Sequence, residues 1–122
     1  MELSDYPRLA ISRDYLRDAR HMELSSSTRL RCAWESIYFC CCEVAALQGR
    51  QLDGLEHPDT DIVDNALRAI GLPEDERRHV LEMLHWAAYQ QPLLPGPCLT
   101  EDACDLAEEF HDCTVAIALA QR

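Results

Sequence analysis

The chain has 122 residues, which is enough for a single domain that buries a hydrophobic core without disulfides or a metal. Hydrophobic residues make up 48% of it, and 22 acidic residues outnumber 11 basic residues, so the net charge is −11. This charge repels phosphate backbones, so we expect no nucleic-acid binding without a basic partner or a local basic patch.

The spacing of hydrophobic residues predicts helices along the whole chain and no strands. The first helix begins at Pro7, a residue that suits the first turn, and its apolar side chains recur as far as Met22. The polar residues from Ser25 to Thr28 then interrupt the pattern and can cap the next helix. In all we expect about five helices, over residues 7–22, 29–48, 60–70, 73–90 and 100–120.

The helix predicted over residues 29–48 is the most apolar part of the chain. Its broad inner face has Leu30, Ala33, Trp34, Ile37, Tyr38, Cys41, Val44 and Ala45. A second apolar set, Cys32, Phe39 and Ala46, falls on the opposite side. A helix that is apolar on nearly all sides lies at the centre of a bundle or against another subunit. We therefore predict a homo-oligomer, with Cys32, Phe39 and Ala46 at the interface between copies.

The last three helices have clear start and stop signals. Gly71 ends the helix over 60–70, and the acidic residues after Pro73 favour the dipole of the helix that follows. The inward residues of that helix are expected to be Val80, Leu81, Leu84, Ala87 and Ala88. A proline-rich connector over 91–99 precedes the last helix, whose inward stripe is Ala103, Ala107, Phe110, Thr114, Ile117 and Ala118. Together these elements predict one all-α domain, residues 1–122, folded as an up-and-down helical bundle.

The chain shows no targeting or redox signature. Its first residues, Met1 to Asp5, are acidic, no secretory signal follows, and no segment approaches the roughly 20 apolar residues of a membrane span. We expect a cytoplasmic protein without membrane contact, in which the seven cysteines are reduced. Cys40, Cys41 and Cys42 would point in different directions around a helix, and no C-x-x-C motif is present. We therefore expect no metal and no other cofactor.

Two helix faces have residues that could perform chemistry. Arg78, Glu82, His85 and Tyr89 follow each other at steps of four, three and four, so they share one face of the helix over 73–90. Such a stripe could bind a ligand or position an acid and a base, because His titrates near neutral pH. The stripe lies opposite Leu84 and Ala87, however, so a solvated face is the simpler interpretation. The functional interpretation requires a second subunit or domain that covers it.

The last helix has a weaker candidate for a metal site. Cys104, Glu108 and His111 are four and three residues apart, so they too share a face. With a fourth ligand from elsewhere they could bind zinc. The alternative, which we favour, is that they form the polar edge of an amphipathic helix.

The order of these features resembles that of a known family. The first helix contains Tyr-Leu-Arg-Asp-Ala-Arg over residues 15–20, and a long helix rich in small residues runs from Leu30 to Gly49. A later helix ends in His-Trp-Ala-Ala-Tyr over residues 85–89, before a proline-rich loop and an acidic last helix. In these features the whole chain resembles the HEPN superfamily, small helical-bundle proteins of prokaryotes. The resemblance implies a dimer that pairs with a nucleotidyltransferase or acts in a toxin–antitoxin system.

The resemblance leaves two functions open. Nucleases of the superfamily have an Arg followed by Asn or Asp, with a His four to six residues after the Arg. Here Arg78 precedes His85 with six residues between them, but His79 follows the Arg. We therefore favour a non-catalytic accessory module that binds a partner protein, and we expect the purified chain not to cleave RNA. The alternative is a metal-independent RNase of this superfamily that uses Arg78 and His85.

Overall fold

The computed structural model describes residues 5–89 and 96–121 of the chain. The helices are α1 (Pro7–Ala19), α2 (Ser26–Leu47), α3 (Thr60–Ile70), α4 (Glu74–Tyr89) and α5 (Thr100–Ala120). The described residues contain no strand. The prediction of an all-α bundle of five helices is confirmed. The proline-rich connector predicted over 91–99 falls mostly outside the described residues, as does the side chain of Tyr89.

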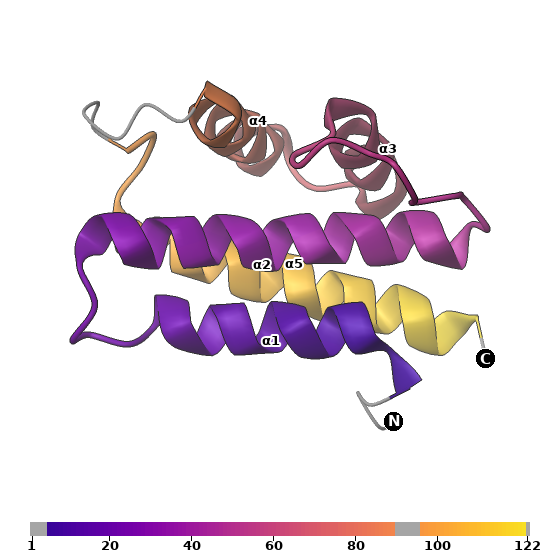
Figure 1. Cartoon of the computed structure of the whole chain (residues 1–122), viewed down its shortest axis with the longest axis horizontal. Coiled ribbons are helices and arrows are strands. Elements are labelled where there is room, and N and C mark those ends of the chain that lie inside the picture. Colours follow the sequence, from indigo (N-terminus) through magenta and orange to yellow (C-terminus); the bar gives the residue numbers. More distant parts are fainter. Residues whose placement is uncertain (1–4, 90–95, 122) are drawn as a thin grey trace.

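Helix α2 organises the bundle. Figure 1 shows α1, α2 and α5 lying lengthwise beside one another, with α3 and α4 on the side of α2 away from α1. Helices α3 and α4 are seen nearly end-on in this view, so they cross α2 and do not run along it. Helix α2 contacts each of the other four helices. This central position explains why its sequence is apolar on more than one side.

Capping side chains set the helix boundaries. The Ser25 hydroxyl accepts a hydrogen bond from the backbone N–H of Thr28 at 3.2 Å, so α2 begins at Ser26 and not at Arg29 as predicted. The Asp59 carboxylate accepts from Ile62 N–H at 3.1 Å and caps α3 in the same way. Gly71 closes α3 with a φ of 70°, a left-handed conformation that a Cβ would disfavour.

The first helix is shorter than predicted. Helix α1 ends at Ala19, and Met22, which the pattern placed on the buried face, is 75% exposed. The reason is a tertiary contact, because the Arg29 guanidinium donates from Nε to the Ala19 carbonyl oxygen at 2.7 Å. This bond satisfies a carbonyl in the last turn, where a cation also favours the helix dipole.

The hydrophobic core contains the side chains that the sequence pattern selected on α2. All eight residues of the predicted inner face are buried, and the largest fully buried side chains of the described core include Trp34, Phe110, Leu9 and Ile37. On α4 the prediction is partly wrong, because Leu81 is 40% exposed and Ala88 is also exposed. Met83 is buried in their place, so the inward spacing on α4 is 80, 83, 84 and 87. None of the helices in the described part of the chain is long and apolar enough to cross a membrane.

Candidate functional site

The polar stripe of α4 lies on its solvent side. Arg78, Glu82 and His85 are all exposed. The Arg78 guanidinium lies 3.3 Å from the Asp75 carboxylate and 3.9 Å from that of Glu82, and the Arg78 side chain is 60% exposed. Two carboxylates thus offset the charge of Arg78, which leaves it poorly suited to stabilise a phosphorane. The geometry agrees with the solvated-face interpretation of this stripe.

The three metal-ligand candidates of α5 do not converge on one point. The Cys104 thiol donates to the Ala19 carbonyl oxygen at 3.3 Å, and the Glu108 carboxylate accepts from Arg20 at 2.7 Å. The His111 Nδ1 lies 3.1 Å from the Ser12 hydroxyl. Among the residues that the structure describes, no group of three or more His, Cys, Asp or Glu side chains could hold a metal ion.

The apolar set predicted as an interface forms a stripe along the outer side of α2. We call Cys32, Phe39 and Ala46 the α2 stripe; all three side chains are half-buried. The Phe39 ring stacks on Tyr15 of α1, with ring centroids 5.8 Å apart and an interplanar angle of 20°. One helical turn before Tyr15, Ile11 is 39% exposed. The apolar surface therefore extends from α2 onto α1.

Carboxylates with polar partners in their own chain flank this apolar surface on both sides of Phe39. One turn before it, the Glu35 carboxylate lies 2.8 Å from His57 Nε2. One turn after it, the Glu43 carboxylate lies 3.8 Å from the Arg8 guanidinium. Burial raises the pKa of Glu43, and Arg8 opposes that shift. Because each carboxylate has a partner within its own chain, covering the surface would not leave an unpaired acid.

A buried polar cluster joins α1, α2 and α5 at the centre of the bundle. The Ser12 hydroxyl donates to the Ser36 carbonyl oxygen at 2.9 Å. The same hydroxyl lies 3.0 Å from Ser36 Oγ, 3.1 Å from Cys40 Sγ and 3.1 Å from His111 Nδ1. Since the one Ser12 proton goes to the carbonyl oxygen, the imidazole must donate from Nδ1 to the hydroxyl. The sequence analysis did not find this cluster, although polar residues at inward helix positions were a signal for it.

Burial keeps the groups of this cluster uncharged. It raises the pKa of the Cys40 thiol to about 12 and lowers the pKa of His111. Asp112 opposes the shift of His111, whereas the nearby charge of Arg13 adds to it. Ser12, Ser36 and Cys40 are completely buried. A substrate therefore has no access to these potential nucleophiles, and the arrangement is suited to fixing helix positions and not to catalysis.

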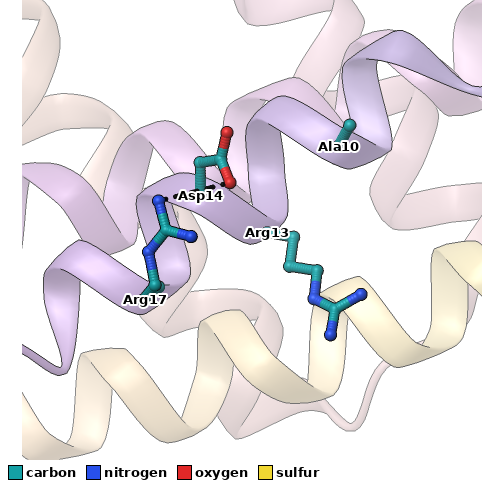
Figure 2. A pocket seen from close by; sticks show the side chains of 4 residues that line it. All are labelled: Ala10, Arg13, Asp14 and Arg17. Carbon is teal, nitrogen blue, oxygen red and sulfur yellow. Dashed lines mark ion pairs between the residues drawn. The ribbon is translucent and has the colours of Figure 1, made fainter. Parts of the chain in front are cut away.

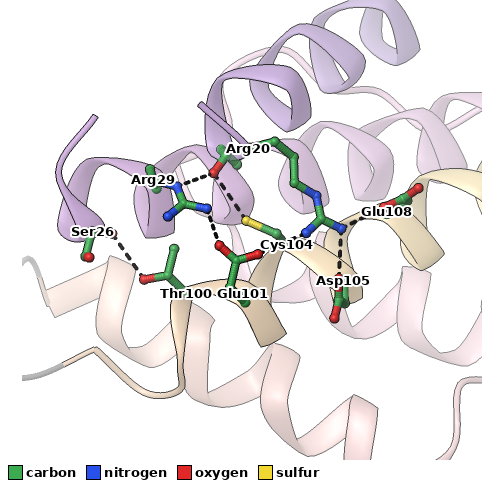
Figure 3. Close-up of polar contacts among 9 residues, drawn as sticks. Arg20, Ser26, Arg29, Thr100, Glu101, Cys104, Asp105 and Glu108 are labelled. Atoms are coloured by element: carbon green, nitrogen blue, oxygen red, sulfur yellow. Dashed lines mark hydrogen bonds and ion pairs between the residues drawn. The ribbon is translucent and has the colours of Figure 1, made fainter. Parts of the chain in front are cut away.

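An ion-pair network ties the end of α1 to the start of α2 and to α5 (Figure 3). Arg20 donates to Asp105 at 2.8 Å, to Glu108 at 2.7 Å and to Glu101 at 3.3 Å. The buried Arg29 binds the other oxygen of Glu101 and the Ala19 carbonyl. The acidic side of α5 thus has a specific structural use, which neither its charge nor its spacing indicated.

Comparison of this chain with family models, with curated proteins and with solved structures gives no match. What the structure defines is the class, an all-α bundle of five helices in its described part. Folds of this kind have many different functions, so the fold by itself assigns none to this chain.

Proposed function

We propose that the chain is a non-catalytic helical interaction module, cytoplasmic in a prokaryotic cell, that forms a homodimer and acts with a partner protein. The resemblance to HEPN proteins suggests an accessory role of the toxin–antitoxin or nucleotidyltransferase-associated type. The observation that carries the proposal is the half-buried Phe39, which stacks on Tyr15 at the centre of the apolar surface on α1 and α2. Exposed apolar surfaces with polar rims commonly mark protein interfaces.

The size of this surface favours a two-helix interface. The α2 stripe runs for about 21 Å along the helix axis, at the usual rise per residue. A stable interface buries about 800 Å² on each partner, which is more than one stripe of side chains supplies. Tyr15 and Ile11 widen the surface onto α1. A symmetric dimer would place the two aromatic pairs together near its axis, and this symmetry is the commonest in soluble oligomers.

Two features support a role without catalysis. The only guanidinium proposed for chemistry, that of Arg78, is already close to Asp75 and Glu82. The buried thiols have raised pKa values, as for Cys40 and Cys41, so they are poor nucleophiles. No observation favours the RNase alternative over the interaction module.

Light scattering after size exclusion, at tens of micromolar protein, tests the proposal. We expect twice the chain mass for the wild type and for a Leu81→Glu control, since Leu81 on α4 is an apolar residue as exposed as Ile11. Phe39→Glu should give the monomer mass with unchanged helical circular dichroism. Because Phe39 is half-buried, Ile11→Glu provides a second variant with little effect on the fold, and it should weaken the dimer.

A monomeric wild type at these concentrations would contradict the proposal. Labelled single-stranded RNA, incubated with the same preparations, tests the alternative. Cleavage by the wild type that is lost in His85→Ala would favour the RNase over the accessory module.

A further inference from the structure

We propose that a hollow on the outer face of α1, between Arg13 and Arg17, binds a single carboxylate, from an Asp or Glu side chain of a partner protein. This inference rests on the proposed role as an interaction module, but it does not depend on dimerisation. The hollow has a volume of about 520 Å³ and is lined by Ala10, Arg13, Asp14 and Arg17. Their spacing puts all four on one face of the helix.

Side-chain directions create this hollow. Figure 2 shows Arg13 extending from α1 toward α5, while Arg17 turns back toward Asp14. Ala10 has no side chain beyond Cβ, so nothing from that position fills the space one turn before Arg13 and Asp14. The long side chains thus form the walls of the hollow, and a short anionic group can approach between them.

Of the two arginines that line the hollow, only Arg17 pairs with a carboxylate among the described residues. The Arg17 guanidinium lies 3.4 Å from the Asp14 carboxylate, so its charge is largely offset. Arg13 is exposed and has no hydrogen bond and no ion pair with any residue in the described ranges. In contrast, Arg8 on the same helix and Arg20 directly after it both pair with carboxylates of other helices. The lining as a whole carries one excess positive charge, in a chain with a net charge of −11.

The single excess positive charge of the lining favours an oxyanion with one negative charge. A guanidinium offers a planar fork that matches carboxylate and phosphate oxygens. A phosphate carries more than one negative charge near neutral pH and would face the Asp14 carboxylate beside it. The strongly acidic remainder of the chain also repels polyanions at longer range. These conditions are met best by an Asp or Glu side chain of a partner protein whose contact with this chain is confined to the area around Arg13.

His111 provides an internal reporter of occupancy. The positive charge of Arg13, on α1, contributes to lowering the pKa of His111 on α5. The imidazole also lies near the Ser12 hydroxyl of α1, the Cys40 thiol of α2 and Asp112 of its own helix. A carboxylate bound to Arg13 would offset the guanidinium charge. The pKa of His111 should therefore rise when the site is filled.

The test is a nuclear magnetic resonance titration of the full chain with a capped peptide that has a single glutamate, at constant ionic strength. We expect a saturable shift of the Arg13 Nε–H signal together with a rise in the His111 pKa. In Arg13→Gln, His111 should titrate higher from the start, and the peptide should not change its pKa. Arg77→Gln, which removes another exposed arginine from α4, should bind like the wild type. The monomeric Phe39→Glu variant should also bind, which separates this inference from the proposed dimer.

Three results would overturn the inference. The first is the absence of a saturable shift up to tens of millimolar peptide. The second is equal binding by Arg13→Gln. The third is tighter binding of inorganic phosphate than of the peptide, which would assign the site to phosphate groups.

Discussion

Replacing Ser12 by Ala tests whether the polar cluster at the centre of the bundle stabilises the fold. The substitution removes a hydroxyl that lies within 2.9 to 3.1 Å of four polar atoms on α2 and α5. The backbone of α1 should not change, because Ala is the best helix former. The cost arises from the partners, above all the buried His111 Nδ1–H, which would keep only the weak acceptor Cys40 Sγ at 3.9 Å.

The expected loss follows from general hydrogen-bond energetics. A buried donor left unsatisfied costs about 1 to 3 kcal/mol, and the lost neutral hydrogen bonds add about 1 kcal/mol. We therefore expect Ser12→Ala to lower the free energy of unfolding by about 2 to 4 kcal/mol. For a domain of this size that corresponds to a decrease in Tm of about 8 to 16 °C, at roughly 4 °C per kcal/mol.

Thermal and urea unfolding, followed by circular dichroism, measure this effect. Ser27→Ala is the matched control, because Ser27 is an exposed residue in the first turn of α2. It should shift Tm by no more than about 2 °C, since exposed substitutions usually change stability little. The urea m value should stay the same in both variants. A Tm for Ser12→Ala equal to that of the control would refute the cluster as a stabilising element.

Two further predictions concern charged groups near α5. The pKa of His111 is lowered in the folded state, so the unfolded chain binds a proton more readily. The contribution of His111 to stability should therefore be complete above the unfolded pKa of about 6.5 and decrease as the pH falls below it. Urea unfolding between pH 5 and 7 measures this, and His111→Gln should lose this part of the pH dependence. Arg29→Met removes the guanidinium that binds Ala19 and Glu101, so its Tm should fall below that of Arg78→Met, whose guanidinium is exposed. Equal Tm values for the two arginine variants would contradict a structural role for Arg29.

The periodicity of the sequence was sufficient to predict the helices and the core face of α2. A helix period of 3.6 residues places Leu30, Ile37 and Val44 on one side whatever the neighbours are, and these residues are buried. The boundary of α1 could not be predicted in this way. Met22 continues the apolar spacing, but the Arg29 contact with Ala19 ends the helix earlier. A periodic pattern contains no information on such a contact between segments.

The candidate sites were predicted less well than the helices, and for a related reason. Helical spacing predicted that Cys104, Glu108 and His111 share a face of α5, but it could not show that each side chain has a different partner. Ser12 and His111 are 99 residues apart in the chain, so only the packing of α1 against α5 brings them together. The same packing brings the charge of Arg13 near enough to lower the pKa of His111, which no local pattern indicated.

The charge of the chain explains why its two proposed binding surfaces differ in character. Two copies with a net charge of −11 repel each other, so a dimer interface must be apolar or have its charges paired locally. The surface around Phe39 meets this condition, because Glu35 and Glu43 both have partners in their own chain. The negative charge of this chain also repels the carboxylate of a partner, and an arginine without an acidic partner of its own offsets this repulsion locally. Arg13 supplies such a cation on the face of α1 that is lined by Ala10, Asp14 and Arg17, which leaves Ile11 and Tyr15 available to the second copy.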